Sequence, residues 1–265
     1  KRVKYKFLKN NHHIAGATNE GIDMASGDFI ALLDHDDILQ SNALFEVVDA
    51  LNKNKNIDFI YTDEDKVSDK NRHIQPFLKP SWNPDFLYSV NYITHFSVIR
   101  KSVLDKVGHE DGKYNGAQDW ELFLRVARNI PDQNIHHIDK ILYSWRMHGT
   151  STAKLLETKP YVIEAQRKVI ENDLEKLSVT DFTLAQDRVY PGQWQLMFNP
   201  KSTPKISIFV SDEKIKDQKK YIQEHTDYPD YEVLPKTSNE TYGNLLSKTS
   251  GDILVIIDSN LKITD

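Results

Sequence analysis

Two nine-residue segments of the chain match each other in residue type along their whole length. Residues 26–34 read SGDFIALLD and residues 250–258 read SGDILVIID. In each, a Ser-Gly-Asp turn precedes a short apolar run typical of a buried strand, and the run ends in aspartate. Such self-similarity indicates an internal repeat. We therefore expect two related units, the second of which stops where the first reaches its acidic cluster.

Predicted strands and helices alternate along both units. Residues 57–61 form another apolar run, and Leu44, Val47, Val48 and Leu51 form one stripe of a helix that Ser41 would cap. Alternation of this kind predicts an α/β fold with a mainly parallel sheet, helices on both faces, and ligands beyond the carboxyl ends of the strands. The period-two pattern of residues 3–8 predicts one further strand.

The domain boundaries follow from the same pattern. We expect a first domain over residues 1–177 that opens partway through its sheet, a connector over residues 178–204 with Pro-Gly and Pro-rich stretches, and the start of a second domain over residues 205–265.

Composition excludes several classes of protein. The 34 basic and 39 acidic residues are well mixed and give a net charge of -5, which argues against a nucleic-acid partner. The absence of cysteine excludes disulfides and thiolate metal sites. Apolar runs fall short of the roughly 18 to 20 residues that span a bilayer, so we expect a soluble, cytoplasmic chain.

Asp34, His35, Asp36 and Asp37 follow the apolar run of the first repeat. Carboxylates grouped in this way suit Mg²⁺ or Mn²⁺, particularly when a diphosphate completes the coordination shell. The alternative is a solvated turn that also caps the next helix, and acidic turns of that kind are common after strands.

A second acidic position, Asp119, opens a predicted helix in the segment GAQDWELFLR. The helix dipole and free N–H groups there would favour its charged form, which would make it an available base at neutral pH. The alternative is an ordinary helix cap. Further along, Arg146 and His148 stand beside a run of hydroxyl residues, a chemistry suited to phosphate and metal.

Taken in order, these motifs resemble the family-2 glycosyltransferases. The series is residues 11–19, the SGD segment running into residues 34–37, then QDW at 118–120 and WRMH at 145–148. YTDED at 61–65, KPSWNPD at 79–85 and NYI at 91–93 look further like the bacterial branch that builds rhamnose-rich surface polysaccharides. The resemblance implies a GT-A fold with a mixed sheet, a UDP- or dTDP-sugar donor, and a glycan or lipid-linked acceptor.

The resemblance also implies roles for individual residues. Asp36 would bind Mn²⁺ or Mg²⁺, Asp34 the nucleotide ribose or the metal shell, and His148 the metal or diphosphate. Asp119 would act as the general base, with inversion at the anomeric carbon. Asn19 would contact the nucleotide sugar, and the expected substrate contacts are Asp37, Asp63, Asp65, Trp82, Trp120 and Arg146.

Three departures from the family pattern limit what the resemblance implies. The strand, helix and strand that hold the nucleotide base in the family would lie upstream of Lys1, and Thr18 stands where many relatives carry an arginine. The second repeat continues as Asp258-Ser259-Asn260, with one carboxylate, so we expect it to bind metal poorly.

Two other readings therefore stay open beside the enzyme. One is a catalytically inactive module that binds a glycan or a partner. The other, less favoured, is a phosphohydrolase, because the Asp-x-Asp-x-Thr/Val pattern reads DHDDI here. Pairing of two copies through open sheet edges and a peripheral contact with the inner face of the membrane stay open as well.

Overall fold

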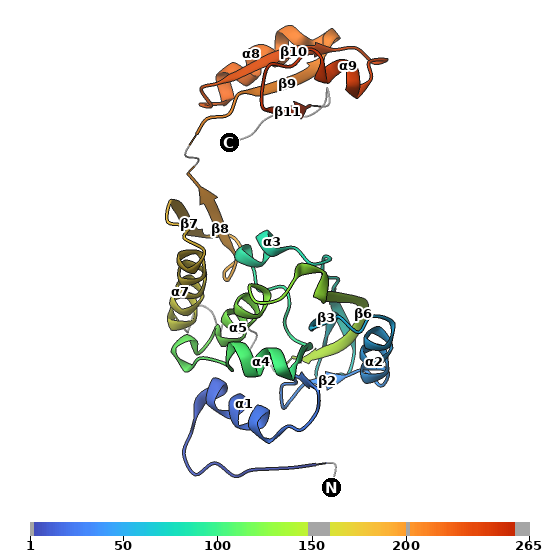
Figure 1. The fold of residues 1–265 in the computed structure, drawn as a ribbon, viewed down its shortest axis with the longest axis vertical. Helices are drawn as coiled ribbons and strands as arrows, with labels where there is room; N and C mark the ends of the chain where they lie inside the picture. The colour runs from blue at the N-terminus through green and yellow to red at the C-terminus, as the bar shows by residue number, and fades with distance from the viewer. Residues whose placement is uncertain (1–2, 148–159, 200–201, 258–265) are drawn as a thin grey trace. The chain divides into compact units, whose positions relative to one another are not determined.

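The computed structural model describes residues 3–147, 160–199 and 202–257, and it divides into two compact units (Figure 1). The first unit covers Lys1–Phe198 and the second Asn199–Asp265. Because strands and helices are mixed in both, the prediction of an α/β fold is confirmed. None of the helices in the described ranges is both long and apolar enough to cross a bilayer.

The first unit is built on a six-stranded mixed sheet. Its strands are β1 (Phe29–Ala31), β2 (Ile38–Leu39), β3 (Phe59–Val67), β4 (His73–Phe77), β5 (Ser97–Arg100) and β6 (Ile135–Arg146). The main path is β1-β5-β3-β6-β2, and β4 pairs with β3 beside it. Only the β3–β6 pair is parallel among these described strands, so the expectation of a mainly parallel sheet is wrong here. The short β3–β4 connection requires an antiparallel pair, since parallel neighbours need a long crossover.

Helices cover both faces of this sheet, as predicted. Successive residues of β3 point to opposite faces, so Phe59 and Tyr61 enter one apolar cluster and Ile60 enters another. The larger cluster receives helices α1 (His13–Met24), α4 (Lys101–Val107), α5 (Gln118–Ala127) and α7 (Pro160–Lys176), together with the short α3 (Pro84–Ser89). Helix α2 (Ala43–Lys53) packs into the smaller one.

Helix α2 differs from its prediction in cap and face. Asn42, rather than Ser41, occupies the N-cap position, and its side chain makes no capping hydrogen bond. The helix buries Ala43, Val47 and Ala50, whereas Leu44 is 62% exposed. Two small alanines therefore face the sheet, and they allow α2 to lie closer to the sheet than the predicted leucine stripe would.

The N-terminal segment, residues 3–8, forms no strand, which corrects that prediction. Val3, Tyr5 and Phe7 are all exposed, so the alternating pattern has no sheet to pack against among the described residues. A period-two pattern predicts a strand only when one of its faces finds a partner.

Part of the predicted connector folds as a hairpin. β7 (Phe182–Gln186) and β8 (Trp194–Phe198) pair antiparallel, and Trp194 is buried in the larger apolar cluster of the first unit. The role of residues 178–204 as a domain connector stays a prediction.

The second unit repeats the start of an α/β sheet. Its elements are β9 (Ile206–Ser211), α8 (Ile215–His225), β10 (Tyr231–Lys236), α9 (Tyr242–Leu246) and β11 (Ile253–Ile256). The strand order is β10-β9-β11 with parallel pairing. Gly251 is required here, because a Cβ atom would lie 2.6 Å from the Lys205 carbonyl oxygen. Both repeated segments therefore contain a short strand, β1 and β11, while Asp258, Ser259 and Asn260 lie outside the described residues.

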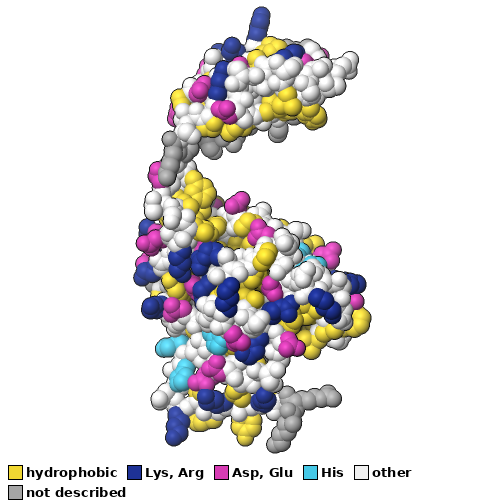
Figure 2. All heavy atoms as spheres, in the orientation of Figure 1, with side chains coloured by type: hydrophobic (Ala, Val, Ile, Leu, Met, Phe, Trp, Pro, Cys, Tyr) yellow, Lys and Arg dark blue, Asp and Glu magenta, His cyan; other side chains and the backbone are white. Residues whose placement is uncertain are grey.

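Charged side chains of both signs lie intermingled on the face of the first unit in Figure 2. This distribution agrees with the mixed charge of the sequence.

Candidate active site

The acidic segment after β1 is held in place by β6. Asp37 accepts a hydrogen bond from the Tyr143 hydroxyl and a second from the backbone N–H of Arg146, at 2.7 Å. The Arg146 guanidinium donates from Nε to the backbone carbonyl of Asp36, at 2.9 Å. Asp37 and Arg146 therefore shape the loop, and their role as substrate contacts stays a prediction.

Replacement of Asp37 by alanine should lower the free energy of unfolding by about 2 to 4 kcal/mol, because it leaves two part-buried donors without their acceptor. Asp34→Ala serves as the matched control, since the Asp34 side chain has no hydrogen bond or ion pair among the described residues. Urea denaturation of the two variants measures the difference. Equal stability of the two variants would contradict the structural role of Asp37.

The two remaining carboxylates of the segment belong to Asp34 and Asp36. The pKa of Asp34 is raised, first because neighbouring protein atoms displace water from the carboxylate, and then because Asp37 and Asp36 repel its charge; His95 acts in the opposite direction. His35 lies 3.6 Å from Asp36, measured from Nδ1 to Oδ1. A cation at this position would relieve the repulsion among the carboxylates.

A cavity of about 730 Å³ opens next to this segment. Its apolar wall comes from α1 and β1, and its polar end comes from residues that are far apart in the sequence. The volume lies in the range of roughly 300 to 1,000 Å³ that small-molecule sites occupy. The polar lining consists of Thr18, Asp34, Thr94, His95, Glu110, Gln118 and Asp119.

Asp119 lies in the first turn of α5 and lines this cavity. Asn91 donates a hydrogen bond to its Oδ2 at 3.0 Å. Desolvation raises the pKa of Asp119; N–H groups at the helix start and the charge of His95 oppose the rise, and Asp34 adds to it. The N–H groups at the helix start favour the charged form, but burial outweighs them, so the net effect on the pKa is opposite to the predicted one.

His95 belongs to the same cavity and was not predicted. Its backbone N–H and ring Nδ1 both contact Glu64 Oε2, at 2.7 and 3.0 Å, and buried Lys79 reaches the same oxygen at 3.2 Å. Burial opposes protonation of the imidazole, but the hydrogen bond and charge of Glu64, with the charge of Asp34, outweigh it and raise the pKa of His95. A positively polarised ring thus stands near Asp34 and Asp119.

Glu110 is the second lining residue that the sequence did not indicate. It follows α4, and Asn19 holds its backbone from α1: the Asn19 amide donates to the Glu110 carbonyl at 2.8 Å and accepts from its N–H at 3.0 Å. Asn19 therefore uses both ends of its amide inside the protein, and its contact with the nucleotide sugar stays a prediction. No motif marks either Glu110 or His95, because each owes its place to tertiary contacts.

Asp63 and Asp65 are not among the residues that line the cavity. Both are buried on β3. Asp63 accepts from the Lys79 N–H at 2.8 Å and pairs with His137 at 2.7 Å, and Asp65 pairs with His73 at 2.8 Å. Their role as substrate contacts stays a prediction.

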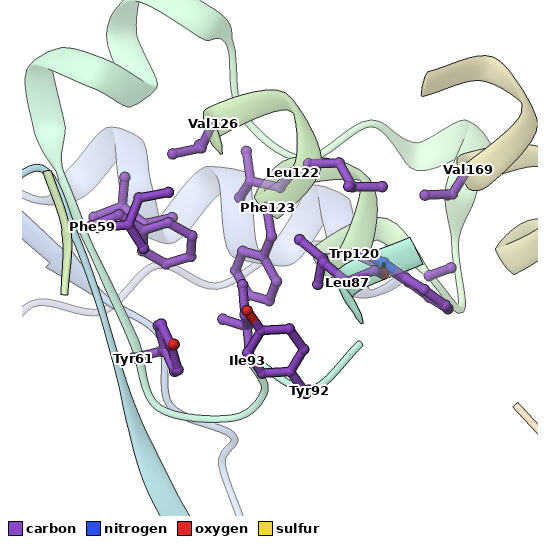
Figure 3. Close-up of a cluster of buried hydrophobic side chains, with 14 of the residues drawn as sticks. Phe59, Tyr61, Leu87, Tyr92, Ile93, Trp120, Leu122, Phe123, Val126 and Val169 are labelled. Atoms are coloured by element: carbon purple, nitrogen blue, oxygen red, sulfur yellow. Dashed lines mark hydrogen bonds between the residues drawn. The ribbon is translucent and has the colours of Figure 1, made fainter. Parts of the chain in front are cut away.

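The two tryptophans predicted as substrate contacts also lie outside the cavity lining. Trp120 is 1% exposed, packs beside Leu87 in the core and donates its ring N–H to the Leu87 carbonyl at 2.9 Å (Figure 3). Its contact with a substrate stays a prediction. Trp82 packs partly against the same cluster and donates to Asp132 at 2.9 Å, outside the cavity lining.

The oxygen donors at the strand end fit a hard divalent cation. Asp34 and Asp36 supply carboxylates, while Asp37 is engaged by β6. Across the described ranges, no group of three or more His, Asp or Glu side chains is arranged to hold a metal ion. A diphosphate would then have to complete the shell. His148, the third predicted ligand, lies outside the described residues.

Comparison with known proteins relates the first part of this chain to a family. Residues 1–108 match the model of glycosyl transferase family 2. The uncharacterized protein y4gI of Sinorhizobium fredii is 36% identical over 79% of this chain, and the O-antigen biosynthesis protein RfbC of Myxococcus xanthus is 31% identical over 91%. The chain spans 23% and 19% of these relatives, respectively.

Among solved structures, the crystal structure of S. aureus TarS 1-349 matches this chain with a TM-score of 0.43 and 14% sequence identity. The match covers 63% of this chain and 52% of the TarS chain. The family match includes α1, β1 and the acidic segment, and the mixed sheet with helices on both faces agrees with the predicted GT-A fold. The chain therefore carries a domain of glycosyl transferase family 2, as its ordered motifs predicted.

Proposed function

We propose that this chain is the catalytic part of a metal-dependent, inverting glycosyltransferase. The observation that supports it most is the single cavity that Asp34 and Asp119 both line, one from the end of β1 and the other from the start of α5. Sugar transfer with inversion needs positive charge at the leaving diphosphate, which a cation held by carboxylates would supply, and a base on the opposite side of the sugar. Asp34 would help to hold the cation, and Asp119 would be the base.

The proposed reaction is a single displacement. The acceptor hydroxyl oxygen forms a bond to the anomeric carbon as the bond from that carbon to the diphosphate oxygen breaks. Asp119 takes the hydroxyl proton, and its raised pKa makes this transfer more favourable at neutral pH. Asn91 orients the carboxylate through its hydrogen bond to Oδ2.

Asp34 and Asp36 would hold the cation with the donor diphosphate. Mn²⁺ or Mg²⁺ bound there would neutralise the charge that grows on the leaving nucleoside diphosphate. His95 adds positive potential at the same end of the cavity, because Glu64 favours its protonated form. These residues act on the leaving group, and Asp119 acts on the acceptor.

The names of the relatives support a role in polysaccharide synthesis. They include the O-antigen biosynthesis protein of Myxococcus xanthus, a chondroitin synthase of Escherichia coli and a hyaluronan synthase of Pasteurella multocida. We propose a UDP- or dTDP-sugar donor, hexosyl or rhamnosyl transfer, a glycan or lipid-linked acceptor, and action at the cytoplasmic face of the membrane. Pairing of two copies is part of the same proposal, and β1 leaves one sheet edge open for it among the described strands.

Metal removal tests the enzymatic proposal. Purified chain, incubated with UDP- and dTDP-sugars and Mn²⁺, should release UDP or dTDP above the rate of a protein-free control, and EDTA should abolish the release until Mn²⁺ is restored. Coupled detection of free nucleoside diphosphate measures the rate. Release that persists in EDTA would contradict metal dependence, and absence of release would favour the alternative of a glycan- or partner-binding module.

A further inference from the structure

Glu110 carries a buried carboxyl group that its protein surroundings leave incompletely satisfied. The residue is 6% exposed, and its Oε2 atom is buried without a hydrogen-bond partner among the described residues. Buried carboxyl oxygens usually have partners, because leaving one unsatisfied costs free energy. Since Glu110 lines the 730 Å³ cavity, a ligand in that cavity can supply the donor.

The position of Glu110 is held from outside its own loop. Asn19 on α1 pairs with both backbone groups of Glu110, at 2.8 and 3.0 Å. Asn19 thereby ties the loop after α4 to the wall of the cavity, and Thr18, the preceding residue of α1, lines the cavity too. Such cross-bracing is expected where a side chain must be kept at a defined place.

The Glu110 side chain lowers the stability of the folded protein. Burial first, and then repulsion by Asp119 and Asp34, raise the pKa of Glu110 to about 7, against a hydrogen bond from Thr18 that lowers it. A carboxyl group with a raised pKa in the folded state destabilises the protein as pH rises above its unfolded pKa of about 4.3. A residue that costs stability in a cavity indicates a requirement of function.

We propose that Glu110 accepts a hydrogen bond from a hydroxyl group of the donor sugar and so positions that sugar between Asp34 and Asp119. The inference rests on the proposed function. Both carboxylates interact electrostatically with Glu110, and the three side chains line one cavity. The donor sugar lies between the leaving diphosphate and the acceptor in an inverting transfer, so a group near both ends is placed to contact its ring substituents. Glu110 is therefore a positioning and specificity residue.

Calorimetric titration with matched pairs of ligands tests this assignment. UDP with UDP-glucose, and dTDP with dTDP-rhamnose, are titrated in the presence of Mn²⁺ into the wild-type chain and into Glu110→Gln. At about pH 8.5, where Glu110 with its pKa of about 7 is mostly ionised, loss of the charge-assisted hydrogen bond should weaken binding of the sugar nucleotide by roughly 10-fold or more. Binding of the free nucleotide should stay within about twofold, because Glu110 contacts only the sugar.

Asp111→Asn is the control, because Asp111 is the next residue, lies outside the cavity lining and can keep its hydrogen bond from the Lys113 N–H as asparagine. It should bind both members of each pair as the wild type does. Equal weakening of nucleotide and sugar nucleotide in Glu110→Gln, or no weakening of either, would overturn the assignment to the sugar. Failure of the wild-type chain to bind any of the four ligands would instead overturn the proposed function on which it rests.

Discussion

Asp119→Asn should reduce the rate of sugar transfer by roughly 100- to 10,000-fold, the range that a positioned general base contributes. Asparagine keeps the size of the side chain and can still accept the hydrogen bond from Asn91. It cannot take the proton of the acceptor hydroxyl. The measurement is the initial rate of nucleoside diphosphate release at saturating donor, followed over pH.

Two further observations separate loss of a base from loss of structure. Nucleotide affinity should be unchanged in Asp119→Asn, and Asp85→Asn should retain full activity, because Asp85 also lies in the first turn of a helix but outside the cavity lining. As the pH is lowered, the wild-type rate should begin to fall at a higher pH than it would with an ordinary aspartate, whose pKa is about 3.9. The reason is that desolvation raises the pKa of Asp119. Activity in Asp119→Asn close to that of the wild type would contradict its role as the base.

The alternation of helices and strands could be predicted from the sequence because it depends on local patterns. Gln118 to Ala127 forms α5 and buries the predicted Leu122, Phe123 and Val126, together with Trp120 and Leu124 on other sides of the helix. The direction of the strands could not be predicted, since it depends on which strands become neighbours after folding. Residues 3–8 have a strand pattern without a strand, because the pattern does not reveal whether a partner is present.

The candidate site likewise contains residues that could be predicted from the sequence and residues that could not. Asp34 and Asp119 stand in recognisable motifs, and both line the cavity, although their roles remain proposals. His95 and Glu110 stand in no motif that identifies them, because Glu64 and Asn19, which hold them in place, are distant in sequence. Position after a helix marks Glu110, which follows α4, but it marks many other acidic residues as well, and His95 precedes β5.

Burial separates several of the predicted site residues from the cavity. Asp63 and Asp65 occupy a strand whose residues are buried on both faces, where histidines pair with them. Trp120 follows Asp119 directly, but a helix turns about 100° per residue, so it points into the core while Asp119 lines the cavity. Neighbours in a motif therefore need not share a function.

Asp36→Asn should weaken Mn²⁺-dependent nucleotide binding by roughly 100-fold or more, since a bound cation contributes several kcal/mol of charge stabilisation to a diphosphate. Asparagine has a similar shape but lacks the negative charge that a hard cation requires. Asp105→Asn is the matched control, because Asp105 lies on the surface of α4 and pairs with Lys101 four residues before it. Its nucleotide binding should equal that of the wild type.

Calorimetric titration of UDP and dTDP into the wild-type chain and Asp36→Asn, each with and without Mn²⁺, tests whether a metal and a nucleotide bind together at the end of β1. We expect at least one nucleotide to bind to the wild type only when Mn²⁺ is present, and this binding to be lost in Asp36→Asn. Binding that is unaffected by Mn²⁺ or by the substitution, or no binding by the wild type under any condition, would contradict a metal-dependent nucleotide-sugar site at the end of β1.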